Sequence, residues 1–159
     1  VKLVTGYPGG NDVNLAMERG EVDGRCGWSW SSLKSQKQWL PNVNVLVQFN
    51  LEKNADIPNV PMALERAPSD EKRQVLRLLI AGQYVGRPFF GSPGISADRK
   101  AALQAAFEAT MKDPQFLADA AKADMEITPL AAGTIEAFLA DLYKTPRDIA
   151  AKAATVIQN

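Results

Sequence analysis

Apolar residues along this chain recur at two spacings, and the first half of the chain alternates between them. In residues 21–30 every second residue is apolar or small, which is the period of an extended strand. Just before this stretch, Val13, Ala16 and Met17 recur three and four residues apart, which is the period of one helix face. The pattern therefore predicts strands at residues 1–7, 21–30 and 42–50, and helices at residues 11–19 and 32–40.

The second half of the chain is predominantly helical by the same criteria. Ser69 is placed to cap a helix that carries Asp70 and Glu71 in its first turn and ends near Gly82. Beyond it the composition shifts toward alanine. An extended piece bounded by proline and glycine is predicted at residues 86–94, and a brief strand at residues 125–130. Helices are predicted at residues 97–112, from Asp113–Pro114, over Ile135–Leu142 and from Thr145–Pro146.

This order of elements predicts an α/β domain with a largely parallel sheet, because strands that alternate with helices usually pair in parallel. Only about three strands precede Pro88, which is few for a parallel sheet covered on both faces. With 159 residues, such a domain can bury roughly two-thirds of the surface that its unfolded chain would expose.

Charge and composition exclude several classes of function. Lysine and arginine total 18, as do aspartate and glutamate, so no field of one sign is available to recruit nucleic acid or anionic lipid. The chain has one cysteine and no histidine, which excludes serine–histidine and cysteine–histidine catalysis within it. Its acidic residues do not show the spacing of a metal site, and we expect neither a metal nor another cofactor. Its apolar runs fall far short of the ~20 residues of a membrane-spanning helix.

The stretch Gly6–Asp12, with the sequence GYPGGND, is the first candidate binding site. It is rich in glycine and lies between a predicted strand and the start of a predicted helix. Free backbone N–H groups and the positive end of a helix dipole meet at such a point, which suits a carboxylate or a phosphate. The stretch lacks the Lys-Ser/Thr of a P-loop and does not match GxGxxG, so a nucleotide is not favoured. A purely structural interpretation stays open, in which Pro8 turns the chain and Asn11 caps the helix.

The cluster CGWSWSS is the second candidate. Two tryptophans on one face, with hydroxyls between and after them, form an apolar wall with polar tips, which is a common lining for a small-ligand cleft. For Trp28 a core position is favoured, whereas for Trp30 the core and the cleft are equally consistent with the pattern. We expect Cys26 to be a buried, unreactive thiol, and Asp23 and Arg25 to pair with each other or to face solvent.

Three segments, taken in order, carry a resemblance to a known family. They are KLVTGYPGGNDVNLAMERGEVDG, ADIPNVPMALE and GRPFFGSPGISADRKAALQAAFEATMKDPQFLADAAKADMEITPL. Together they resemble the solute receptors of tripartite tricarboxylate transporters, the periplasmic binding proteins of the Bug family. The chain departs from that family's pattern at Thr5–Pro8, where a Tyr-Lys-Gly is common, and at its two tryptophans. We therefore expect a ligand that differs from the usual di- and tricarboxylates.

The resemblance implies a fold and a division of the chain. The fold would be a two-lobed, type II periplasmic-binding-protein-like Venus flytrap, of which this chain would be the C-terminal half. Residues 1–85 would then form an α/β segment of the second lobe, residues 86–94 the hinge or crossover, and residues 95–159 the helical part that completes the first lobe.

The resemblance also implies a function without catalysis. The chain would be a periplasmic receptor that binds a small organic anion, in particular a carboxylate, between the lobes and delivers it to membrane permease subunits. Two alternatives stay open: an enzyme acting on a small anion with Asp12 or Asp23 as base, or a truncated domain that binds nothing alone and forms a homodimer. The expected ligand-binding residues are Gly6, Tyr7, Gly9, Gly10, Asn11, Asp12, Ser29 and Trp30.

Overall fold

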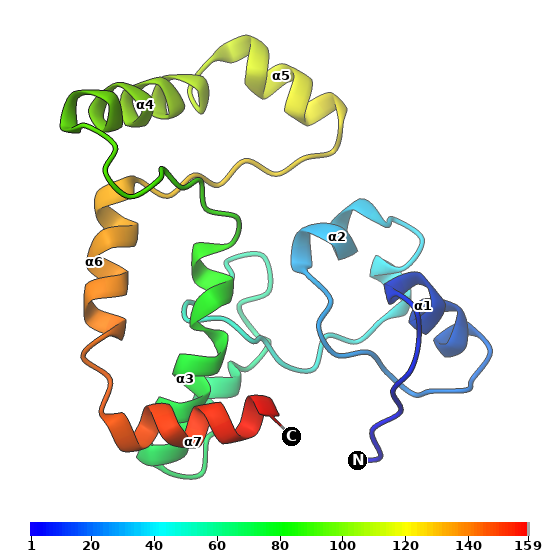
Figure 1. The fold of residues 1–159 in the computed structure, drawn as a ribbon. Coiled ribbons are helices and arrows are strands. Elements are labelled where there is room, and N and C mark those ends of the chain that lie inside the picture. The colour runs from blue at the N-terminus through cyan, green and yellow to red at the C-terminus, as the bar shows by residue number, and fades with distance from the viewer. Residues whose placement is uncertain (159) are drawn as a thin grey trace. The chain divides into compact units, whose positions relative to one another are not determined.

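Helices joined by extended or irregular chain make up the structure, a computed structural model that describes residues 1–158 (Figure 1). Contacts between backbone positions divide the chain into two units. The N-terminal unit comprises Val1–Val43 together with Asp124–Glu126, and the second unit comprises the residues between and after these segments. Each unit has its own helices and its own small set of buried residues.

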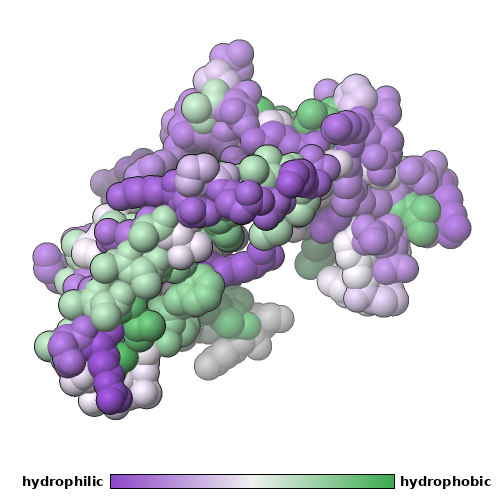
Figure 2. All heavy atoms as spheres, turned by 90° about the horizontal axis from the view of Figure 1, so that it is seen from above, coloured by the Kyte–Doolittle hydropathy of each residue, from purple (hydrophilic) through white to green (hydrophobic). Residues whose placement is uncertain are grey.

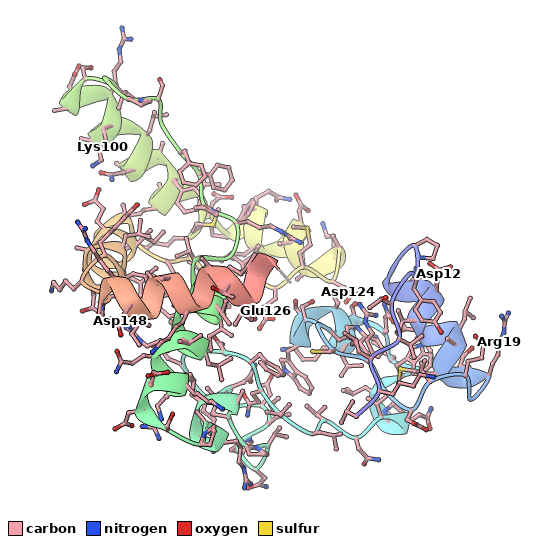
Figure 3. The ribbon with its side chains drawn as sticks, turned by 60° about the horizontal axis from the view of Figure 1, so that its bottom comes forward. Asp12, Arg19, Lys100, Asp124, Glu126 and Asp148 are labelled. Atoms are coloured by element: carbon pink, nitrogen blue, oxygen red, sulfur yellow. The ribbon has the colours of Figure 1, made fainter. Side chains whose placement is uncertain are left out.

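The N-terminal unit is built around two α-helices. α1 begins after Gly9, whose backbone is extended, and its dipole is complemented by Asp12 in the first turn and Arg19 at the C-terminal cap (Figure 3). α2 begins after Ser29, whose side-chain oxygen accepts a hydrogen bond from the backbone N–H of Ser32. The elements of this unit are α1 (Gly10–Glu18), α2 (Trp30–Ser35) and the 3-10 helix η1 (Leu40–Asn42).

The second unit contains the α-helices α3 to α7. Two of them begin directly after a capping residue that the sequence indicates. Ser69 caps α3 by accepting a hydrogen bond from the N–H of Lys72, and Asp113 caps α5 by accepting one from the N–H of Phe116. Both caps agree with the sequence-based prediction. The elements are η2 (Ala63–Arg66), α3 (Asp70–Val85), α4 (Ala97–Thr110), α5 (Pro114–Lys122), α6 (Ala132–Leu142) and α7 (Arg147–Gln158).

The best-packed part of the second unit is the contact between α3 and α7. Each helix contributes buried residues: Ile80 and Ala81 on α3 are 4% and 1% exposed, and Ile149 on α7 is 4% exposed. At the edge of this contact, Nζ of Lys152 lies 2.7 Å from a carboxylate oxygen of Glu71. Hydrophobic burial stabilises the helix pair, and the ion pair joins the two helices at the surface.

The predicted parallel sheet is absent, so the expectation of an α/β Venus-flytrap fold is wrong. The structure is 53% helical and 1% strand, and the strand pairing among residues 1–158 is a single parallel bridge between Gln48 and Met62. The backbone conformation of two glycines explains part of the wrong strand prediction. Gly6 and Gly27 have φ of 100° and 78°, a left-handed conformation that interrupts an extended run and breaks its period of two. The predicted strand at residues 1–7 is therefore irregular chain, and so is the one at residues 21–30 up to Trp30, where α2 begins.

The chain also buries less surface than expected from its length. Its accessible surface is 11984 Å², whereas an unfolded chain of this mass would expose about 25,000 Å². The structure thus buries about half of that surface and not two-thirds. Figure 2 shows hydrophobic residues on the face that it presents, intermixed with polar ones. Apolar area therefore remains available for further contacts.

Candidate functional site

The first turn of α1 provides backbone donors without a side-chain cap. Gly9 occupies the cap position with φ −164° and ψ 173°, and it has no side chain to accept a hydrogen bond from the turn. Its carbonyl accepts the hydrogen bond of Val13 N–H at 3.3 Å, which starts the helical ladder. The first N–H groups of any α-helix lack partners within the helix. Those of Gly10, Asn11 and Asp12 therefore stand at the positive end of the α1 dipole, and these three residues line a pocket.

Arg25 supplies a positive charge beside this turn. Its Nη1 donates hydrogen bonds to the carbonyl oxygen of Gly10 at 3.0 Å and to Oδ1 of Asn14 at 2.9 Å. Its guanidinium carbon lies 4.7 Å from the centroid of the Trp28 ring, a cation–π contact. Asn14 is itself buried and donates to Oε1 of Gln36 at 3.4 Å. A chain of polar contacts therefore fixes the direction of the guanidinium.

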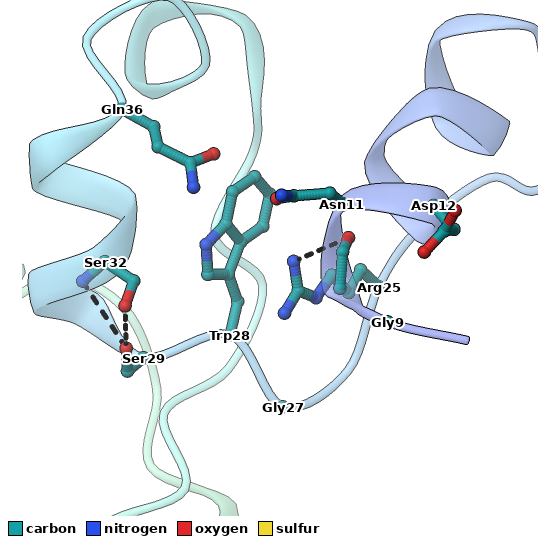
Figure 4. A pocket seen from close by; sticks show the side chains of 10 residues that line it. Gly9, Asn11, Asp12, Arg25, Gly27, Trp28, Ser29, Ser32 and Gln36 are labelled. Carbon is teal, nitrogen blue, oxygen red and sulfur yellow. Dashed lines mark hydrogen bonds between the residues drawn. The ribbon is translucent and has the colours of Figure 1, made fainter. Parts of the chain in front are cut away.

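The start of α2 forms the opposite wall. Ser29 Oγ donates a hydrogen bond to Ser32 Oγ at 2.7 Å and accepts one from the backbone N–H of Ser32 at 3.4 Å. The two hydroxyls are exposed and lie at the pocket (Figure 4). Because a hydroxyl can donate and accept, this wall suits either a carboxylate oxygen or a ligand hydroxyl.

Together these walls enclose an open cavity of about 410 Å³ within the N-terminal unit. This volume lies in the range of small-molecule sites. The lining holds one guanidinium, from Arg25, and one carboxylate, from Asp12 (Figure 4). The full lining is Gly9, Gly10, Asn11, Asp12, Arg25, Gly27, Trp28, Ser29, Ser32 and Gln36.

The structure brings together five of the eight residues expected to bind a ligand. Gly9, Gly10, Asn11, Asp12 and Ser29 line the cavity. The other three, Gly6, Tyr7 and Trp30, are outside its lining.

Sequence reasoning missed the charged centre of the cavity. Arg25 was expected to pair with Asp23 or to face solvent, and Trp28 was expected to favour the core. The turn at Gly27 brings both side chains to one place, since it ends the extended run that would have set them apart. An arginine between a glycine-rich loop and a serine cluster was the available signal.

Within residues 1–158 no group of three or more histidine, cysteine, aspartate or glutamate side chains is placed to hold a metal ion. Cys26 is exposed, contrary to the expectation of a buried thiol, because the irregular chain around it provides no core. In the same part of the chain, no helix combines the length and the hydrophobicity that crossing a bilayer requires.

No protein-family model matches the chain, and neither a curated protein nor a solved structure shows a significant similarity to it. The resemblance to tripartite tricarboxylate transporter receptors therefore rests on the sequence segments alone.

Proposed function

We propose that this chain is a solute-binding protein without catalytic activity, and that the cavity of its N-terminal unit holds the carboxylate group of a small organic anion. One observation carries the proposal. The uncapped first turn of α1 and the guanidinium of Arg25 converge on one cavity, so two independent sources of positive potential act at the same point.

The arrangement of donors suits a carboxylate. A carboxylate can accept from two backbone N–H groups at a helix start and from an arginine that is already oriented. Orientation of Arg25 by Asn14 and by the Gly10 carbonyl lowers the entropy that binding would otherwise cost. The serine hydroxyls and the Trp28 ring are available for the remainder of the ligand.

The balance of charge favours a ligand with a single carboxylate. Asp12 lies on the lining together with Arg25, so a second or third negative charge on the ligand would meet repulsion. This agrees with the expectation, drawn from the departures at Thr5–Pro8 and at the tryptophans, that the ligand differs from di- and tricarboxylates.

The resemblance to the transporter receptors supports a wider role, which we include in the proposal. The protein would act in the periplasm and pass its ligand to membrane permease subunits. The site proposed here lies within one unit and does not require a cleft between lobes.

Ligand-dependent thermal unfolding tests the proposal. All three tryptophans, Trp28, Trp30 and Trp39, belong to the N-terminal unit, so their fluorescence reports its unfolding separately from that of the second unit. The panel consists of mono-, di- and tricarboxylates, with the matching amides as controls. We expect acids to stabilise this unit and the amides to leave its stability unchanged. Saturation at a hundred times Kd would add about 2.7 kcal/mol. Stabilisation by no member of the panel, or turnover of a stabilising acid detected by NMR, would contradict a non-catalytic carboxylate receptor.

A further inference from the structure

The cavity of the N-terminal unit has two halves of different chemistry. One half is cationic, because it holds the guanidinium of Arg25 and the first turn of α1. The proposed carboxylate contacts belong to this half. The rest of the lining, which we call the neutral half, carries no charged side chain and is available to select the remainder of the ligand. It consists of the side chains of Trp28, Ser29, Ser32 and Gln36.

The neutral half presents hydrogen-bond donors that have no partner among residues 1–158. Nε1 of Trp28 lies on the edge of the ring that faces Ser32, and no described residue accepts its proton (Figure 4). Ser29 and Ser32 bring two hydroxyl protons, of which one lies between their oxygens and the other is left over. Gln36 accepts from Asn14 through Oε1 at 3.4 Å, and its Nε2 stays free to donate. Since every buried side-chain nitrogen and oxygen of the described residues has a partner, these donors are accessible.

The two halves are close enough for one small molecule to contact both. Asn14 joins them, because its side-chain amide accepts from Nη1 of Arg25 at 2.9 Å and donates to Oε1 of Gln36 at 3.4 Å. These contacts share one amide group, so Nη1 and Oε1 are at most about 9 Å apart. With a hydrogen bond of about 3 Å at each end, this span fits an acid that carries an oxygen on its second or third carbon.

We propose that the ligand is a hydroxy or oxo monocarboxylate, and that Trp28, Ser32 and Gln36 recognise its hydroxyl or keto oxygen. This inference rests on the proposed carboxylate site. A neutral oxygen can accept from all three neutral donors, whereas an ammonium group has no lone pair to accept with. An alkyl chain would gain little, because Trp28 supplies the one apolar side chain of the described lining.

Calorimetric titration of the full chain with acids that differ by one oxygen tests the selection. The pairs are propionate with lactate and butyrate with 3-hydroxybutyrate. In at least one pair the hydroxylated acid should bind about tenfold more tightly. Alanine, whose ammonium group only donates, should bind no more tightly than propionate. Equal affinities within both pairs, or tighter binding of alanine than of lactate, would overturn this inference and leave the carboxylate site standing. Binding of none of these acids would contradict the proposed function itself.

Two conservative variants test the named donors. Ser32→Ala removes a hydroxyl and keeps the cap of α2, since Ser29 Oγ still accepts from the backbone N–H at position 32. Trp28→Phe removes Nε1 and keeps an aromatic ring beside Arg25. Each should reduce the preference for the hydroxylated acid about threefold or more. Ser35→Ala, at an exposed position of α2 outside the cavity lining, is the matched control and should keep the wild-type preference. An undiminished preference in both Ser32→Ala and Trp28→Phe would overturn the assignment.

Discussion

Nη1 of Arg25 donates a hydrogen bond of 2.9 Å to the side-chain oxygen of Asn14, a residue that is 4% exposed. The same nitrogen donates to the carbonyl of Gly10 at 3.0 Å. The cation of the cavity is thus held by a buried amide on α1 and by the first turn of that helix. Because both partners belong to the protein itself, they orient the guanidinium and lower the entropy that binding would otherwise cost.

Replacement of Asn14 tests this support. Asn14→Ala removes the hydrogen bonds to Arg25 and Gln36 and leaves the guanidinium without its buried partner. We expect the N-terminal unit to lose about 1–3 kcal/mol of unfolding free energy, measured by urea titration with tryptophan fluorescence. Asn11→Ala, at an exposed position of the same helix, is the control and should change stability by less than about 0.5 kcal/mol. Equal losses in the two variants would argue against an anchoring role for Asn14.

The glycine at the first position of α1 is required by the close approach of Arg25. A Cβ at Gly10 would lie 2.8 Å from Cζ of Arg25, so the guanidinium would have to shift. Gly10→Ala should weaken carboxylate binding roughly tenfold while the unit stays folded, because the end of a long side chain can move. Gly24→Ala, where a Cβ meets nothing within 4 Å, is the matched control. Unchanged binding in Gly10→Ala, measured by calorimetry, would remove this contact from the site.

A buried glutamine organises the loop before η2. Nε2 of Gln48 donates to the carbonyls of Ile57 and Val60, each at 2.9 Å, and Oε1 accepts from the N–H of Asn54 at 2.9 Å. Gln48→Leu removes all three hydrogen bonds; the Ile57 carbonyl keeps the N–H of Val60, but the Val60 carbonyl and the Asn54 N–H lose the partner that Gln48 supplies, which should destabilise the loop by about 2 kcal/mol or more. Hydrogen exchange of residues 50–61 should accelerate accordingly. Gln74→Leu, at an exposed position of α3, should leave that exchange unchanged.

The pair between α7 and α3 predicts a dependence of stability on pH. The hydrogen bond to Glu71 is the largest cause that raises the pKa of Lys152 above its ordinary value of 10.5, followed by the charges of Glu71 and Asp148. A raised lysine pKa stabilises the folded state below the unfolded pKa, and the contribution is lost as pH rises through the folded pKa. Wild type should therefore be more stable than Lys152→Met at about pH 8, and the difference should shrink above about pH 11. Urea unfolding by far-UV circular dichroism measures it, and a difference independent of pH would contradict the linkage.

Sequence patterns predicted most of the helices well, although α2 (Trp30–Ser35) stands where a helix was expected at residues 32–40, and they predicted the remaining chain poorly. Ser69 and Asp113 cap helices as expected, because a cap depends only on neighbouring residues. The sheet was predicted wrongly, since a strand needs a partner elsewhere in the chain and the period of two cannot name it. Residues 42–50 have strand-like composition, yet within this run only Gln48 forms a bridge, with Met62.

In the candidate site too, residues marked by a local sequence pattern were predicted, whereas a residue placed by contacts distant in sequence was not. The glycines of residues 9–10 and the hydroxyl of Ser29 were identified from local pattern, and they line the cavity. Arg25 was not identified, because its position depends on the turn at Gly27 and on Asn14 eleven residues earlier. Contacts of that kind appear only when the chain is folded.

The most direct test of the proposed carboxylate site measures the NMR signal of each proposed hydrogen-bond donor separately. In a ¹H–¹⁵N NMR titration with acetate, pyruvate, succinate and citrate, the amide signals of Gly10, Asn11 and Asp12 and the Nε signal of Arg25 should shift together. The shifts should saturate, should be larger for the monocarboxylates, and should vanish in Arg25→Gln. An absence of saturable shifts with every acid, or saturable shifts confined to other residues, would contradict a carboxylate site at the start of α1.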